Sequence, residues 1–206
     1  MGLYNDVFLP KAIDRVCGSA SFDNLRNRLL ATARGEVLEI GFGSGTNLSH
    51  YPTTVTEVLA VEPAPRMREL AGGRIRERGL PVTFVDLNGS EILADTASCD
   101  TAVSTFVLCT VPDPAATLSE IRRILRPSGT LLLAEHGHAP GAVMAQCQRL
   151  VEPMQRRLAG GCNLTREPLE LVEAAGFEVV SARQDYLGAR SPWGYLTVAT
   201  ARASTA

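Results

Sequence analysis

Short runs of β-branched and aliphatic residues alternate with longer amphipathic stretches along most of the chain. The short runs end in turn signals, which is typical of buried strands, and the stretches between them carry apolar residues at helical spacing. Met67, Leu70, Ala71 and Ile75 share one face, for example, and predict a helix over 67–78. The same patterns predict a helix over 114–125 and strands over 37–40, 58–61, 82–85, 101–106 and 130–134.

Strands and helices that alternate in this way predict a parallel sheet with right-handed crossovers. After residue 140 the pattern changes, to helices over 143–158 and 168–175 and then strands over 178–183 and 195–201. The connection between these last two strands is too short for another helical crossover. We therefore expect them to form an antiparallel pair at one edge of the sheet.

The segment before the first strand, residues 3–33, predicts two helices separated at Gly18. Its first part carries too many apolar side chains to be left in solvent, among them Tyr4, Phe8 and Ile13, so it should pack on the sheet or cover a ligand. A structural cap and a moving substrate lid both fit this pattern. We expect a single domain over 1–206, with a helical cap or lid over 1–33 and a catalytic core over 34–206.

Composition and charge exclude several classes of protein. The chain has 206 residues, 45% hydrophobic and 20% charged, as in ordinary globular proteins, and a net charge of -2 offers no basic surface for nucleic acid. The longest apolar stretch, about 101–111, is too short for a membrane span, and no secretory signal is visible. These features predict a cytoplasmic protein with no stable membrane anchor. Five scattered cysteines without a C-x-x-C pair predict reduced thiols rather than disulfides or a structural zinc site.

A glycine-rich turn follows the strand over 37–40 directly, with the sequence E-I-G-F-G-S-G-T over 39–46. Its glycines permit positive φ and close approach of a ligand to the backbone, and a helix N-terminus after the turn favours an anionic group. The spacing is G-x-G-x-G, since Thr46 stands where a dinucleotide fingerprint has its third glycine. Glu62 ends the second strand, where an acid that binds ribose hydroxyls belongs.

With Glu39 before these glycines and Glu62 after the second strand, the chain resembles the class I S-adenosyl-L-methionine (SAM) dependent methyltransferases. The run L-R-P-S-G-T over 125–130 also resembles the turn before the fifth strand of that family. The resemblance implies a three-layer, Rossmann-like sheet of seven strands, with SAM as cofactor and S-adenosyl-L-homocysteine as product. It implies that the glycines cradle the methionine part of SAM, Glu39 positions its amino group, Glu62 binds the ribose and Asn88 faces the adenine. The expected cofactor-binding residues are Glu39, Gly41, Gly43, Gly45, Asn47, Glu62, Pro63, Leu87, Asn88, Thr105 and Phe106.

The methyl acceptor is expected near the ends of the fourth and fifth strands, because ligands of open α/β sheets bind at the carboxyl ends of strands. His136 follows the fifth strand, and an imidazole is well suited to accept a proton near neutral pH. A histidine that is merely hydrogen-bonded at the rim fits as well. His136 and His138 lack an obvious third ligand, so we expect no metal site.

A finer resemblance rests on the runs L-C-T-V over 108–111, E-H over 135–136 and G-C-N-L-T-R-E over 161–167. Together with Tyr4, Asn47 and Tyr51, they resemble the methyltransferase-like thiol S-methyltransferases, a family that includes membrane-anchored animal alkyl-thiol methyltransferases. This resemblance implies transfer of a methyl group to the sulfur of a small thiol. The expected catalytic residues are His136 and Arg166, and the expected substrate-binding residues are Tyr4, Cys162, Asn163 and Trp193.

Plainer roles fit some of these residues too, since Cys162 and Trp193 suit core packing and Arg166 suits a surface position. The acceptor also has alternatives. The same architecture serves N-, O- and C-methyltransferases of lipid head groups, quinones and other small metabolites. A SAM-binding protein without turnover is a third hypothesis. The sequence does not specify the oligomeric state.

Overall fold

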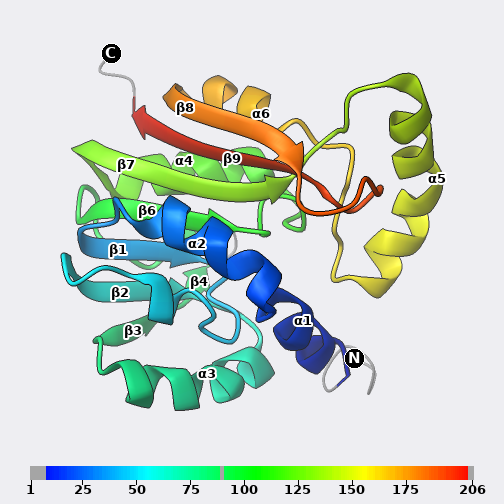
Figure 1. Cartoon of the computed structure of the whole chain (residues 1–206). Coiled ribbons are helices and arrows are strands. Elements are labelled where there is room, and N and C mark those ends of the chain that lie inside the picture. The colour runs from blue at the N-terminus through cyan, green and yellow to red at the C-terminus, as the bar shows by residue number, and fades with distance from the viewer. Residues whose placement is uncertain (1–7, 89–90, 204–206) are drawn as a thin grey trace.

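A computed structural model describes residues 8–88 and 91–203 of the chain. Its centre is a seven-stranded sheet in the order β3-β2-β1-β6-β7-β9-β8 (Figure 1). All neighbours are parallel except β9, which is antiparallel to both β7 and β8. The strands are β1 (Gly35–Ile40), β2 (Val55–Val61), β3 (Val82–Val85), β6 (Cys99–Thr105), β7 (Leu125–His136), β8 (Phe177–Tyr186) and β9 (Tyr195–Ala203). The predicted mostly parallel sheet with an antiparallel C-terminal strand pair is therefore confirmed.

The helices also follow the predicted pattern. They are α1 (Leu9–Cys17), α2 (Asp23–Leu30), α3 (Pro65–Arg78), α4 (Pro114–Ile124), α5 (Ala142–Leu158) and α6 (Pro168–Ala174), with short 3-10 turns at η2 (Ala20–Phe22) and η3 (Leu48–His50). A two-stranded hairpin of β4 (Leu87–Asn88) and β5 (Glu91–Ile92) was not predicted, because strands of two residues leave no periodic signal.

Alternate side chains of the strands supply two cores, one on each face of the sheet. On β7, Leu131 and Leu133 belong to the core that α4 and α6 cover, whereas Leu132 and Ala134 belong to the core that α2 and α3 cover. All four side chains are fully buried. Strand β7 thus carries apolar residues on both faces, as in a sheet that helices cover on both sides.

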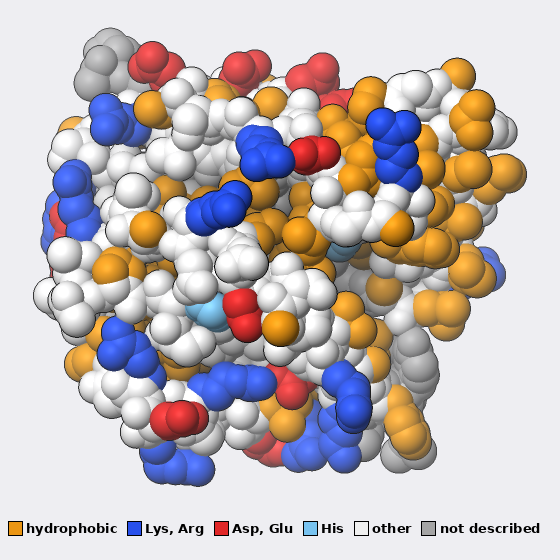
Figure 2. All heavy atoms as spheres, in the orientation of Figure 1, with side chains coloured by type: hydrophobic (Ala, Val, Ile, Leu, Met, Phe, Trp, Pro, Cys, Tyr) orange, Lys and Arg blue, Asp and Glu red, His pale blue; other side chains and the backbone are white. Residues whose placement is uncertain are grey.

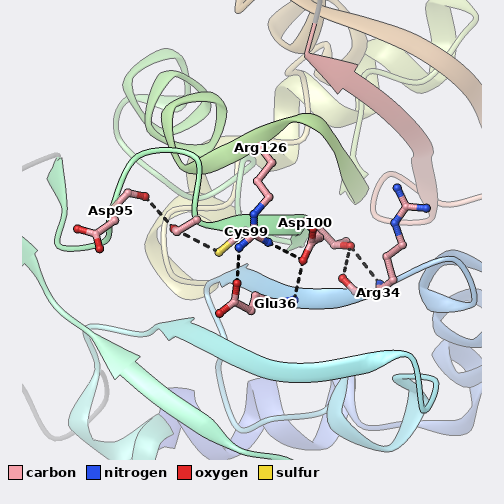
Figure 3. A network of polar contacts seen from close by, with 8 residues as sticks. Arg34, Glu36, Asp95, Cys99, Asp100 and Arg126 are labelled. Atoms are coloured by element: carbon pink, nitrogen blue, oxygen red, sulfur yellow. Dashed lines mark hydrogen bonds and ion pairs between the residues drawn. The ribbon is translucent and has the colours of Figure 1, made fainter.

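Polar contacts link the central strands at their amino-terminal ends, where β1 and β6 begin (Figure 3). Arg126 donates to Asp100 at 2.6 Å and to Glu36 at 2.5 Å, and the backbone N–H of Glu36 donates to Asp100 at 3.1 Å. Arg34 and Thr101 exchange two further hydrogen bonds. These contacts align the starts of β1, β6 and β7. They thereby also fix the carboxyl ends of these strands relative to one another.

Two helices depart from the layered arrangement. Figure 1 shows α1 and α5 beside the carboxyl ends of the strands rather than on a face of the sheet. Hydrophobic side chains gather on the surface over α5 (Figure 2), where Val143, Leu150, Met154 and Leu158 are exposed. Among the described residues, no helix has both the length and the apolar character that a membrane crossing requires.

Candidate active site

A cavity of about 570 Å³ lies at the carboxyl ends of the parallel strands. Gly41 follows β1, Glu62 follows β2 and Phe106 follows β6, and all three line it. On the other side, α1 contributes Leu9 and Ile13. The volume lies within the range of small-molecule sites, about 300–1,000 Å³. The predicted N-terminal helical segment thus covers the predicted ligand site.

The glycine-rich turn forms one wall of this cavity. Gly41, Gly43 and Gly45 all have positive φ, at 64°, 59° and 77°. A Cβ on Gly41 would lie 2.3 Å from Cγ2 of Val107, so that position has no room for a side chain. A Cβ on Gly43 would instead point into open space, with its nearest neighbours at 3.7 and 4.0 Å. A ligand in the cavity can therefore approach the backbone at Gly43, which fits the methionine part of SAM.

Glu62 follows β2 and lines the cavity, and backbone groups orient its carboxylate. The N–H groups of Gly43 and Ala64 donate to its two oxygens at 2.8 and 2.9 Å. Burial raises the pKa of this carboxyl group, which is only 7% exposed. Each oxygen keeps a lone pair that a ribose hydroxyl can use, so the geometry fits the role that the resemblance implies.

Glu39 lies beneath the glycine-rich turn and not among the residues that line the cavity. Its carboxylate accepts hydrogen bonds from Asn47 at 2.8 Å and Tyr51 at 2.7 Å. Asn47 in turn donates to Thr105 and accepts from the buried Arg26. Contact of Glu39 with the amino group of SAM stays a prediction, while its bonds to Asn47 and Tyr51 support the turn from below.

Replacing Glu39 by glutamine should change how stability depends on pH. Burial raises the pKa of Glu39 from 4.5 to about 7, so the folded protein holds this proton more tightly than the unfolded chain. Stability should therefore be greatest below pH 4.5 for this group and fall as pH rises to about 7. A tenfold difference in acidity corresponds to about 1.4 kcal/mol, so the loss is at most about 3.5 kcal/mol.

Denaturant unfolding of the wild type and Glu39→Gln at several pH values measures this effect. The variant should lack the decline across that pH window. Parallel curves for the two proteins would show that Glu39 ionises in the folded state as it does in the unfolded chain.

Asp14 anchors α1 to the glycine-rich turn. Its carboxylate accepts from the hydroxyl of Ser44 at 2.6 Å and from Arg74 at 2.8 Å, and Arg74 also donates to the carbonyl of Ser44. Asp14 itself lines the cavity. Sequence analysis missed this residue, because one acid on an amphipathic helix gives no signal of its tertiary partners.

Asp14→Ala should loosen α1 without unfolding the sheet. Removing two hydrogen bonds to a charged group costs about 1.5 kcal/mol or more, so amide hydrogen exchange in α1 should accelerate roughly tenfold. Lys11→Ala, at an exposed position on the same helix, is the matched control. Equal exchange rates in the two variants would mean that Asp14 does not hold α1 in place.

Phe106, which also lines the cavity, has a strained backbone. Its φ of 60° is unusual for a residue other than glycine, and such strain is concentrated at functional sites. The ring packs between Phe22 and His136, with ring centres 5.2 and 5.1 Å away. Phe106 therefore connects the cavity to the predicted catalytic histidine.

His136 lies beside two buried cysteines. Its Nδ1 is 3.6 Å from the sulfur of Cys109 and 3.6 Å from that of Cys162, and the two sulfur atoms are 3.7 Å apart. The hydrogen bond with Cys109, with a further contribution from His136, lowers the pKa of Cys162 to about 5. We call Cys109, His136 and Cys162 the thiol–imidazole cluster. Cys109 was not among the predicted site residues, although it lies in the run L-C-T-V over 108–111 that resembles the thiol S-methyltransferases.

Other predicted acceptor residues support the loop that carries Cys109. The side chain of Arg166 donates to the carbonyl of Leu108, and the backbone and side chain of Asn163 donate to the carbonyl of Cys109 at 2.8 and 2.9 Å. From the other side, buried Glu135 accepts from three consecutive backbone N–H groups, of residues 107–109. The loop is therefore held in one position by contacts on both sides.

The predicted site residues fall into three groups. Those that line the cavity are Gly41, Gly43, Glu62, Pro63, Leu87, Thr105 and Phe106. Those that lie outside its lining are Glu39, Gly45 and Asn47 in or under the turn, and His136, Cys162, Asn163, Arg166 and Trp193 in or around the thiol–imidazole cluster. Tyr4 and the side chain of Asn88 lie outside the described part of the chain.

Comparisons with known proteins agree with this geometry. A family model for a methyltransferase domain matches residues 38–133. The chain is 35% identical to thiol S-methyltransferase TMT1B of Homo sapiens over 169 residues, which cover 79% of the chain and 68% of that protein. It is 36% identical to thiol S-methyltransferase TMT1B of Rattus norvegicus over 149 residues, which cover 70% of the chain and only 60% of that relative.

Solved structures show the same fold. A SAM-dependent methyltransferase from Aquifex aeolicus matches with a TM-score of 0.66 and 16% identity, over 93% of this chain and 97% of that one. At this identity the likeness concerns the fold alone. The cavity walls, the match over 38–133 and the identity to TMT1B together place the chain in the family of SAM-dependent methyltransferases that includes the thiol S-methyltransferases.

Proposed function

We propose that the protein transfers the methyl group of SAM to the sulfur of a small apolar thiol. The observation that carries this proposal is the meeting of three separate segments. The runs over 108–111, 135–136 and 161–167, which carry the resemblance to thiol S-methyltransferases, meet in the thiol–imidazole cluster. Apolar side chains on the cavity wall, such as Ile13, Phe106 and Val111, favour an apolar acceptor.

The bond changes of this reaction define what the protein must do. The S–H bond of the acceptor breaks, its sulfur bonds to the methyl carbon, and the bond from that carbon to the sulfonium breaks to leave S-adenosyl-L-homocysteine. The protein must align the two sulfur atoms, exclude water and ionise the acceptor. Helix α1 lines the cavity and is the element that we expect to exclude water. Ionisation is needed because a free thiol, with a pKa near 8.5, is only a few per cent thiolate at neutral pH.

His136 is the residue that we expect to be required for this ionisation. It is the imidazole at the carboxyl end of β7, and its ring contacts Phe106 on the cavity wall. Arg166 keeps a proposed positioning role, because it holds the loop of Cys109 through the Leu108 carbonyl.

Mass spectrometry of product formation tests the proposal. The purified full chain is incubated with SAM and a panel of small alkyl and aryl thiols, next to vesicles of phosphatidylethanolamine and a reduced quinone as rival acceptors. We expect thioether and S-adenosyl-L-homocysteine in equal amounts from at least one thiol. Methylation of the amine or the quinone, without methylation of any thiol, would contradict the proposal and identify that compound as the class of acceptor. SAM binding without any product would favour a non-catalytic protein.

A further inference from the structure

The thiol–imidazole cluster also has the geometry of a metal site. We propose that Cys109, His136 and Cys162 bind a zinc ion and leave its fourth coordination position open. In the described part of the chain, each of these three side chains offers one possible ligand atom, and the three atoms lie within 4.8 Å of one another. No metal site was predicted, since His136 and His138 lack an obvious third ligand in the sequence. The three residues of the cluster are 26 or more positions apart and form no motif.

The distances between the ligand atoms support this proposal. Zinc binds cysteine sulfur at about 2.3 Å and histidine nitrogen at about 2.0–2.1 Å in tetrahedral sites. Such a tetrahedron has S···S edges of about 3.8 Å and S···N edges of about 3.5 Å. The cluster has an S···S distance of 3.7 Å and two S···N distances of 3.6 Å. The spacing of the three atoms therefore matches that of three corners of a zinc tetrahedron.

The ligands are held in place by an outer shell of hydrogen bonds. The backbone of Cys109 donates to Glu135 at 3.2 Å and accepts from Asn163. The side chain of Gln155 hydrogen-bonds to Cys162, and Trp193 donates to Gln155 at 3.0 Å. Hydrogen bonds of this kind fix the orientation of ligands in metal sites. Two soft sulfur ligands and one imidazole favour zinc over harder cations.

The open position is inferred from the ligand count and from the place of the cluster. Catalytic zinc sites have three protein ligands and an open position, whereas structural sites have four protein ligands. Phe106 and Thr110, on either side of Cys109 in the sequence, line the cavity, and so do Ala159 and Gly160 just before Cys162. Ala159 packs directly against the buried cysteines. The three ligands themselves do not line the cavity, so the cluster lies next to the part of the wall that these residues form.

A zinc ion at this place would give the ionisation of the acceptor a chemical basis, an extension that rests on the proposed function. Binding of the ion releases the protons of Cys109 and Cys162 to solvent. An acceptor thiol bound at the fourth position would lose its proton to solvent and be held as a thiolate. Methyl transfer from SAM would then give the thioether and S-adenosyl-L-homocysteine, and no group would be oxidised or reduced. His136 would act as a ligand through Nδ1.

Cobalt titration of the metal-free full chain under reducing conditions tests the site itself, without reference to activity. We expect one equivalent of cobalt to bind with a sulfur-to-metal charge-transfer band, and zinc to displace it. Cys109→Ser and Cys162→Ser should each weaken binding by more than about 100-fold, beyond the cost of losing an outer-shell partner. Cys147→Ser, a half-buried cysteine of α5, is the matched control and should bind normally.

X-ray absorption of the zinc-loaded wild type tests the same ligands without any variant. We expect two sulfur neighbours at about 2.3 Å and a nitrogen at about 2.0–2.1 Å. Failure of the wild type to bind either metal would overturn the proposal. So would normal cobalt binding by both serine variants, or a disulfide between Cys109 and Cys162 in the reduced preparation.

A small alkyl thiol added to the cobalt-loaded protein tests the open position. We expect the charge-transfer band to change, and chelated protein to methylate thiols at least about 10-fold more slowly than zinc-loaded protein. An unchanged band, or full activity without metal, would overturn the open position while leaving the proposed function intact. Metal binding with no methylation of any thiol would instead overturn the proposed function and leave the metal site intact.

Discussion

Gly43→Val is expected to abolish SAM binding while the sheet stays folded. Gly43 lines the cavity and a Cβ added there would meet no atom closer than 3.7 Å, so a valine side chain would fit and occupy the space in which the ligand approaches the backbone. A φ of 59° adds strain for a β-branched residue. Isothermal titration calorimetry should show no heat of SAM binding, and circular dichroism should show an unchanged secondary structure.

Two further variants distinguish a steric block of SAM binding from a loss of protein stability. Gly73→Ala, in α3, adds a Cβ that meets nothing within 4 Å, and it should bind SAM as the wild type does. Gly43→Ala should weaken binding without abolishing it, because its methyl group is smaller. Normal affinity of Gly43→Val would refute the position assigned to the cofactor.

His136→Ala is expected to reduce thiol methylation by about 100-fold or more, the size of effect that loss of an ionising group produces. SAM affinity should change little, because His136 does not line the cavity around the glycine-rich turn. Single-turnover kinetics measures the first quantity and calorimetry the second.

His138→Ala is the matched control for this variant. His138 lies just past the end of β7 and its Nδ1 pairs with Glu167 at 2.9 Å, away from both cysteines. Its loss should leave the rate of methylation within a few-fold of the wild type. A rate for His136→Ala equal to that of His138→Ala would remove His136 from the reaction.

The fold could be predicted from local pattern because each element carries its own signal. The alternation of aliphatic runs and amphipathic stretches predicted the sheet, and the G-x-G-x-G spacing predicted the loop at its edge. Small boundary errors have local causes. The helix predicted to end at Leu125 ends at Ile124, since Leu125 already pairs with Cys99 in the sheet.

The site could be predicted only in part, because its chemistry depends on contacts between distant segments. Gly41, Gly43 and Glu62, which line the cavity, could be predicted because they lie just after the first and second predicted strands. Asp14 was missed because its partners, Ser44 and Arg74, lie on other elements. The sequence likewise offered no sign that Cys109 and Cys162 would meet at one imidazole.

A crystal structure of the full chain with bound S-adenosyl-L-homocysteine tests the central claim most directly. The methionine part should lie against Gly43 and the ribose hydroxyls should bind Glu62. The sulfur of the ligand should then face the end of the cavity at Phe106, beside the thiol–imidazole cluster. A sulfur that faces away from Phe106, or a ligand bound outside the cavity at the carboxyl ends of β1 and β2, would contradict the account.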